Sequence, residues 1–103
     1  MHGFIAKFQA APDKRDVLIE IMKQSNHDLP GCISFVIALD IVEPDMIWVC
    51  EVWDKQESHL ASLELPHVQE AILRATPLVL NMTKIASTLP CFAGPKGAIV
   101  PQG

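Results

Sequence analysis

Four apolar stretches of the chain, separated by turn residues, predict β-strands. In the first stretch, Phe4, Ala6 and Phe8 share one face of the expected strand. Elsewhere apolar residues recur every three or four positions, as they do on one side of an amphipathic helix. The predicted strands cover residues 3–10, 32–39, 46–53 and 79–88, and the predicted helices cover residues 12–26, 55–62 and 66–75.

Proline and short polar residues predict where these helices begin and end. Pro12 suits the first turn of the first helix, because its fixed φ is already helical. Asp54 and Glu57 have the spacing of a capping box, which predicts that the Asp54 carboxylate caps the second helix. Pro66 opens the third helix, and Thr76 is expected to end it because the residue before a proline avoids the α region.

The order of these elements predicts a ferredoxin-like split βαβ sandwich, an α+β fold with a four-stranded antiparallel sheet. In such a fold the helices cover only one face of the sheet. The strand at residues 46–53 is nevertheless mainly apolar on both faces, with Trp48 and Cys50 on one and Ile47 and Val49 on the other. A second copy of the same sheet face is the simplest cover, so we expect a homodimer.

One domain is expected over residues 1–89, because a chain of 103 residues suffices for one domain but not for two. Residues 90–103 contain three prolines and three glycines and are expected to form a C-terminal tail. The tail also holds two apolar segments, residues 91–93 and 98–100. Apolar segments are unfavourable in water, so we expect them to dock, with a partner subunit as one candidate surface.

Composition and charge exclude several kinds of partner. The net charge is −4 and no run of lysines or arginines occurs, so nucleic acid is not expected to bind. No apolar stretch approaches the roughly 20 residues that span a bilayer, and no signal peptide is visible, which predicts a cytoplasmic protein without a membrane partner. Cys32, Cys50 and Cys91 are widely spaced and form no cluster with histidine, which favours buried, reduced thiols and no metal site.

The segment Glu51-Val52-Trp53, followed by Pro66-His67, resembles the antibiotic biosynthesis monooxygenase family. The family pattern is a strand that ends in Glu-x-Trp, then a short helix, then a Ser/Thr-Pro-His turn into the next helix. Pro30-Gly31-Cys32 matches the family's turn into the second strand, and the resemblance covers residues 2–89. It implies a cofactor-independent monooxygenase that oxidises a quinol or polyphenol-like aromatic substrate with O2.

This chain departs from the family pattern at two positions near the expected pocket. Ser62 stands where the family often has a second histidine, and Leu65 stands where it prefers serine or threonine. Haem-degrading members of the family resemble one another in an asparagine on the first strand. Ala6 and Lys7 occupy that place here, so haem degradation is not expected.

Two other functions remain open for the same fold. One is an isomerase or lyase of the same dimeric α+β barrel superfamily, since this fold supports several chemistries. The other is a non-catalytic dimer that binds a small ligand. Polar side chains in the pocket would favour the isomerase or lyase, an aromatic slot would favour the monooxygenase, and a pocket without a base would favour simple binding.

His67 is the candidate catalytic base, because an imidazole titrates near neutral pH and can take a phenolic proton. The alternative is a histidine at a helix start that hydrogen-bonds the preceding turn. The candidates for substrate binding are Trp53, Glu51, Val49, His59 and Ser62.

Two of the candidates for substrate binding, Trp53 and Glu51, also have an alternative interpretation. Trp53 is either a pocket wall or a core tryptophan whose N–H is hydrogen-bonded. Glu51 is either an acid or base with a raised pKa or a partner in an ion pair. His59 is expected to be exposed to solvent. The cations that Glu51 could pair with are Lys7, Lys84 and Arg74.

Overall fold

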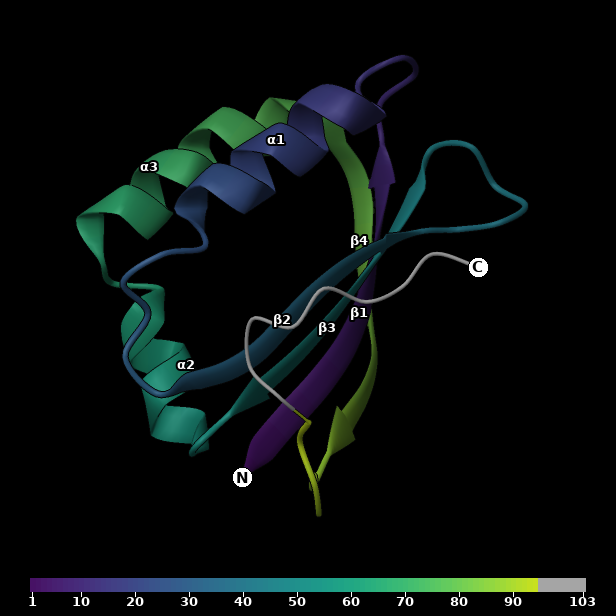
Figure 1. The fold of residues 1–103 in the computed structure, drawn as a ribbon. Helices are drawn as coiled ribbons and strands as arrows, with labels where there is room; N and C mark the ends of the chain where they lie inside the picture. The colour runs from purple at the N-terminus through teal and green to yellow at the C-terminus, as the bar shows by residue number, and fades with distance from the viewer. Residues whose placement is uncertain (95–103) are drawn as a thin grey trace.

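The protein folds as a four-stranded antiparallel sheet with helices packed on one of its faces (Figure 1). The fold is that of a computed structural model, which describes residues 1–94. This architecture confirms the predicted α+β class and the predicted antiparallel sheet. In chain order the elements are β1 His2–Ala10, α1 Arg15–Ser25, β2 Cys32–Leu39, β3 Met46–Trp53, α2 Gln56–Ser62, α3 Pro66–Ala75, the 3-10 turn η1 Thr76–Leu78, and β4 Val79–Thr88.

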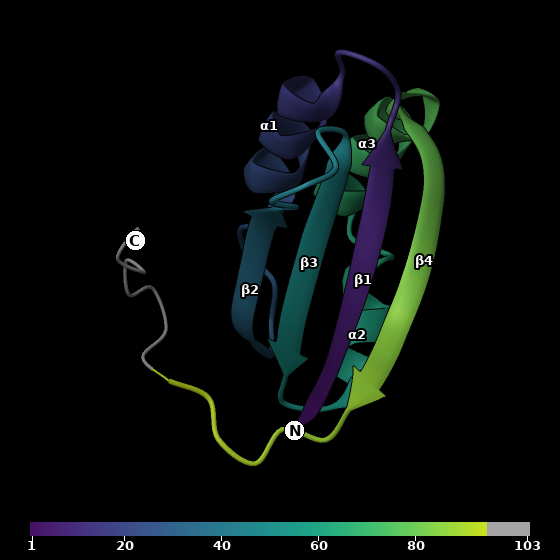
Figure 2. The same cartoon turned by 90° about the vertical axis from the view of Figure 1, so that its right-hand side faces the viewer.

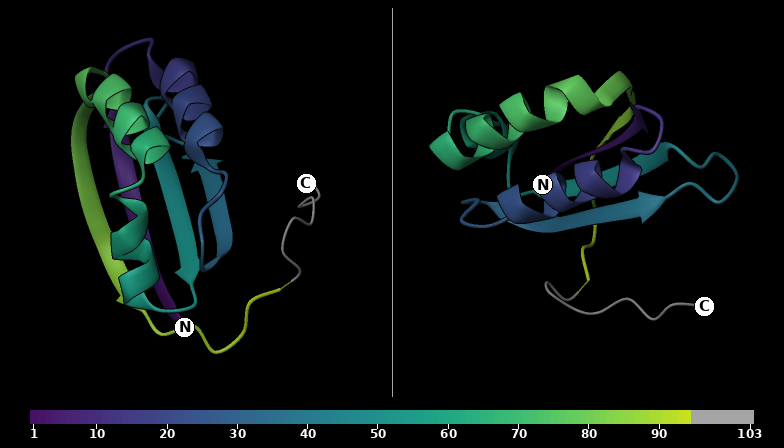
Figure 3. Two further views of the ribbon diagram at one scale, coloured as in Figure 1. Left: turned by 90° about the vertical axis from the view of Figure 1, so that its left-hand side faces the viewer. Right: turned by 90° about the horizontal axis from the view of Figure 1, so that it is seen from above.

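The strand order in the sheet is β2-β3-β1-β4, which makes β2 and β4 the edge strands. Figure 2 shows the four strands in front of the helices, so one sheet face carries no helix of the described chain. We call this side the outer sheet face, and it includes Ile5, Val36, Trp48, Cys50 and Val52. Figure 3 shows α1 and α3 side by side over one part of the sheet, with the short helix α2 near the end of β3.

The hydrophobic core lies between the sheet and the helix pair α1 and α3. Leu18 and Ile47 are completely buried there, and Val49 is 2% exposed. Ile21 continues the buried stripe of α1 that the sequence pattern predicts. Burial therefore identifies the helix-facing side of the sheet, which carries the odd-numbered residues of β3.

Two helix starts differ from the sequence predictions. α1 begins at Arg15 rather than at Pro12, because Asp13 has a positive φ of 64° and belongs to a turn. The N-cap residue of α2 is Lys55 rather than Asp54, and it makes no side-chain capping bond. The Asp54 carboxylate instead accepts a hydrogen bond from the Ser58 side chain, which lowers the pKa of Asp54.

The cysteines also differ from expectation. Of the three cysteines only Cys32 is buried, because Cys50 lies on the outer sheet face and Cys91 follows the last strand. Phe92 is 81% exposed, so the first apolar tail segment does not pack on its own domain. The second segment, residues 98–100, lies outside the described residues. Within residues 1–94, no helix is both long and apolar enough to cross a membrane.

Gly31 is required by the turn that leads into β2. Its φ is +87°, and an added Cβ would lie 2.5 Å from Asp54 Oδ1 and 2.7 Å from Ser58 Cβ. The Asp54 amide also donates to the Gly31 carbonyl at 2.8 Å. We expect Gly31→Ala to lower the free energy of unfolding by about 1–3 kcal/mol.

Urea unfolding of the Gly31→Ala protein measures this loss, with Gly94→Ala as the matched control. An added Cβ at Gly94 would meet no atom within 4 Å, and its φ is not positive. Equal stabilities of the two variants would contradict a conformational requirement at Gly31.

Candidate functional site

A glutamate lies between two phenylalanines on the helix-facing side of the sheet. Glu51 of β3 is the cross-strand partner of Phe4 on β1 and of Phe35 on β2. It has the same parity along β3 as the buried residues Val49 and Trp53, so it faces the helices rather than the outer sheet face. Side chains directly opposite in a sheet are near neighbours. The carboxyl group is therefore flanked by an aromatic ring on each neighbouring strand.

Trp53 hydrogen-bonds the same carboxyl group. The Trp53 indole N–H donates to Glu51 Oε1 at 2.9 Å, and Trp53 is 1% exposed. Burial raises the pKa of Glu51 to about 7, while the Trp53 hydrogen bond acts in the opposite direction. Trp53 is thus a core tryptophan with a satisfied N–H that also fixes the position of an ionisable group.

The ion pair considered for Glu51 is absent from the described part of the chain. Lys7 lies over the Trp48 ring, 5.9 Å from its centroid, on the outer sheet face. Arg74 donates to Gln24 on α1. No cation contributes to the pKa of Glu51, so burial without charge compensation explains its upward shift. The ion pair considered from the sequence is therefore wrong: Lys7 lies on the other sheet face, and Arg74 is hydrogen-bonded to Gln24 instead.

His59 of α2 packs against two of these aromatic rings. Its ring centroid lies 4.6 Å from that of Phe4 and 5.3 Å from that of Trp53. His59 is half-buried, which corrects the expectation of solvent exposure. Burial lowers the pKa of His59, and the nearby positive charges of His2 and Lys84 lower it further. We call the set Phe4, Phe35, Glu51, Trp53 and His59 the aromatic–carboxyl cluster.

His67 contacts a different histidine. Its ring stacks on that of His27, with the centroids 4.3 Å apart, and its Nε2 lies 2.7 Å from the His27 carbonyl oxygen. A carbonyl can only accept, so Nε2 carries the proton in this bond and Nδ1 is the remaining basic atom. The structure therefore places His67 with the turn that follows α1.

The two remaining predicted residues have local roles in the described chain. Ser62 is buried, and its hydroxyl donates to the His59 carbonyl at 2.6 Å within α2. Val49 packs in the hydrophobic core beside Leu18. Of the residues predicted for the site, Glu51, Trp53 and His59 therefore come together directly.

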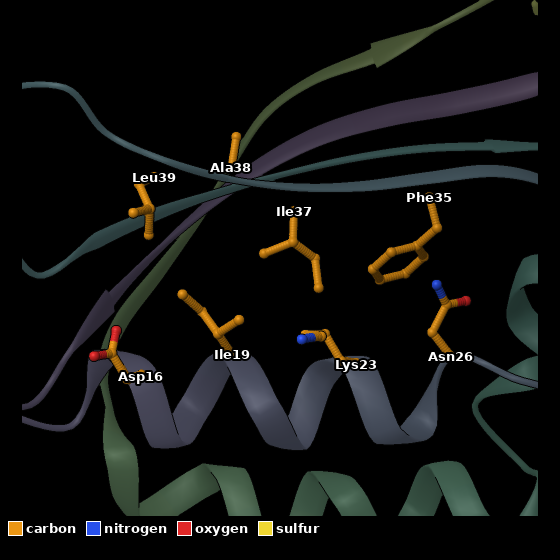
Figure 4. A pocket seen from close by; sticks show the side chains of 8 residues that line it. All are labelled: Asp16, Ile19, Lys23, Asn26, Phe35, Ile37, Ala38 and Leu39. Atoms are coloured by element: carbon orange, nitrogen blue, oxygen red, sulfur yellow. The ribbon is translucent and has the colours of Figure 1, made fainter. Parts of the chain in front are cut away.

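A groove of about 440 Å³ runs along the sheet edge between α1 and β2 (Figure 4). Pockets that bind small molecules have volumes of roughly 300–1,000 Å³ and mainly apolar walls. Figure 4 shows the side chains of α1 facing Phe35, Ile37 and Leu39 of β2, with Phe35 and Asn26 at one end. Since Phe35 is also the neighbour of Glu51, the groove ends beside the aromatic–carboxyl cluster. Its lining residues are Asp16, Ile19, Lys23, Asn26, Phe35, Ile37, Ala38 and Leu39.

Phe4 and Phe35 were not predicted as site residues. The alternation of residues 3–10 places Phe4 on an apolar face, but only the strand register shows that Glu51 lies opposite it. Register joins residues 47 positions apart in the sequence, and no local pattern records it. The described residues contain no group of three or more His, Cys, Asp or Glu side chains that could hold a metal ion.

Comparison with known proteins gives consistent results. The family model for antibiotic biosynthesis monooxygenase matches residues 1–74. A candidate antibiotic biosynthesis monooxygenase from Chloroflexus aurantiacus J-10-fl is 42% identical, with a TM-score of 0.85 and coverage of 93% of this chain and 98% of that one. No curated protein sequence matches this chain.

More distant solved structures share the fold alone. A candidate antibiotic biosynthesis monooxygenase from Nitrosomonas europaea is 14% identical, with a TM-score of 0.79 and coverage of 89% of this chain and 100% of that one. One from Deinococcus radiodurans is 21% identical, with a TM-score of 0.72 and coverage of 98% and 100%. The arrangement of strands and helices is thus conserved where sequence identity is low.

Proposed function

Because this chain belongs to the antibiotic biosynthesis monooxygenase family, we propose that it is a monooxygenase that oxidises a quinol or polyphenol-like aromatic substrate with O2 and without a cofactor. The aromatic–carboxyl cluster is the observation that carries the proposal. The half-buried rings of Phe4 and Phe35 offer apolar surface for a flat ring, and Glu51, held by the Trp53 N–H, is an ionisable group beside them.

The proposed reaction requires three contributions from the protein. It must hold the ring in an apolar site, remove a phenolic proton so that the ring can reduce O2, and keep bulk water from the intermediate. One oxygen atom then enters the substrate and the other leaves as water, with the substrate supplying all four electrons. A mainly aromatic lining around Glu51 and His59 supports this chemistry over an isomerase or lyase, for which polar side chains in the pocket would be expected.

We also propose that the protein acts as a homodimer joined through the outer sheet faces. Val36 and Cys50 are exposed on this face, and Trp48 and Val52 are half-buried. An apolar face without a covering helix is typical of a surface that is buried by association. The aromatic–carboxyl cluster lies on the opposite face of the sheet, so the proposed dimer does not cover it.

Oxygen uptake with a panel of quinols tests the proposed activity, and His67→Ala tests the base that the sequence predicts. If His67 is the base, its removal should lower turnover by roughly 10²-fold or more while the fold remains intact. Gln69→Ala, at an exposed position in the same helix, is the control and should keep the wild-type rate. Wild-type protein that consumes no oxygen with any quinol would refute the monooxygenase proposal.

A further inference from the structure

We infer that Glu51, rather than His67, accepts the phenolic proton, and that the site selects flat aromatic ligands by a hydroxyl group that donates to this carboxylate. The inference rests on the proposed function for the identity of the substrate class. It adds a named acceptor atom and a specificity determinant to that function.

The positions of the neighbouring side chains define the acceptor atom. Trp53 donates to Glu51 Oε1, and within residues 1–94 it is the one hydrogen-bond donor to this carboxyl group. Oε2 is therefore the oxygen that remains to receive a ligand hydroxyl. Because Phe4 and Phe35 stand on either side, a ring that reaches Oε2 packs against aromatic surface.

The proton transfer involves no other reactant. The phenolic O–H bond breaks, its proton passes to Oε2, and the electron pair of the bond stays on the oxygen as a phenolate. Glu51 becomes neutral, which suits a buried site that lacks a cationic partner. A base works best when its pKa lies near the working pH, and burial raises the pKa of Glu51 to about 7.

The two histidines considered are less well placed for this role. His67 Nε2 is bound to the His27 carbonyl, and its ring is stacked on His27 rather than on the cluster. His59 does lie in the cluster, and its lowered pKa makes it a weaker base than an ordinary imidazole. The other ionisable groups on the helix-facing side of the sheet, near the cluster or the groove, are His2 on β1, Lys84 on β4 and Lys23 on α1.

Anaerobic calorimetry with hydroquinone tests the inference, because without oxygen the ligand binds and is not turned over. A carboxylate accepts the hydroxyl hydrogen bond and a neutral carboxyl group accepts it less well. Wild-type affinity should therefore rise about tenfold or more between pH 5.5 and pH 8.5, with its midpoint near the pKa of Glu51. The dimethyl ether of hydroquinone has no hydroxyl to donate, so its affinity should not change with pH.

Three variants identify the group responsible for the pH dependence. Glu51→Gln keeps an oxygen for the Trp53 N–H but cannot ionise, so its affinity for hydroquinone should be independent of pH. Glu57→Gln removes an exposed carboxylate from α2 and should keep the wild-type pH dependence. His59→Gln should also keep the wild-type pH dependence, whether or not its affinity for hydroquinone changes.

The inference is overturned if wild-type affinity does not vary with pH, if the variation persists in Glu51→Gln, or if hydroquinone does not bind. Loss of the variation in His59→Gln but not in Glu51→Gln would assign the acceptor to His59 instead. A pH-dependent affinity that needs Glu51, together with no oxygen uptake, would support this inference and refute the monooxygenase proposal.

Discussion

Above pH 7, the Glu51→Gln protein is expected to be more stable than the wild type, by up to about 3 kcal/mol. The cause is the raised pKa of a buried carboxyl group, which moves from 4.5 to about 7 on folding. Below pH 4.5 the group is protonated in both the folded and the unfolded chain, so it has no effect on their difference in free energy. Between pH 4.5 and about 7 the unfolded chain releases the proton first.

The direction of the effect follows from these proton counts. In that interval the unfolded chain binds fewer protons than the folded one, so the wild type loses stability as the pH rises. The loss is complete once the pH exceeds the folded pKa of about 7. Glutamine imitates the neutral carboxyl group and avoids this loss, so the difference between the two proteins should grow across the same interval.

Urea unfolding of both proteins at pH values from 4.5 to 8.5 measures the difference directly. Other titrating groups affect both proteins equally and cancel in the comparison. Glu57→Gln, at an exposed position, should differ from the wild type by a constant amount. A difference for Glu51→Gln that stays constant with pH would mean that the Glu51 pKa is not raised on folding.

The second large effect is expected for Cys50→Arg, which should convert the proposed dimer to a monomer. Cys50 is exposed in the protomer, so the arginine can be accommodated without disturbing the core. In a symmetric interface each subunit would bring one such cation into a largely apolar contact, at a cost of several kcal/mol per charge. Each 1.4 kcal/mol corresponds to a factor of ten, so the dissociation constant should rise on the order of 10³-fold or more.

Sedimentation equilibrium over nanomolar to micromolar concentrations checks the expected change in mass. Leu73→Arg is the matched control, because Leu73 is 76% exposed on α3, on the other side of the sheet. It should behave as the wild type does. If Cys50→Arg and Leu73→Arg associate equally, the subunits do not meet through the outer sheet faces.

The sequence predicted elements well where their signals are local. The bounds of β2, β3, α3 and β4 agree with the expected ranges, because proline, glycine or aspartate residues at their ends mark them in the chain itself. The start of α1 was wrong because Pro12 suits a turn as well as a first helical residue. The capping interaction of Asp54 was wrong because Ser58 offers its side chain to the same carboxylate.

The site was harder to predict because it depends on contacts between distant elements. Glu51 and Trp53 are two residues apart in one strand, and their grouping could be predicted. The half-burial of His59 depends on Phe4, which the sheet brings beneath α2 from the start of the chain. The contact of His67 with His27 joins residues 40 apart. Neither contact has a signature in the local pattern of residues.

The strand order also determines when the domain can be completed during synthesis. β1 is made first, but it pairs with β3 on one side and with β4 on the other. β4 ends at Thr88, and a ribosome adds roughly 5–20 residues per second. At least one edge of β1 therefore stays unpaired for several seconds during synthesis. Pairing between such distant segments slows folding, because the loop between them must close before any contact forms. The nascent chain therefore exposes the strand that carries Phe4 until almost all of the described domain has been synthesised.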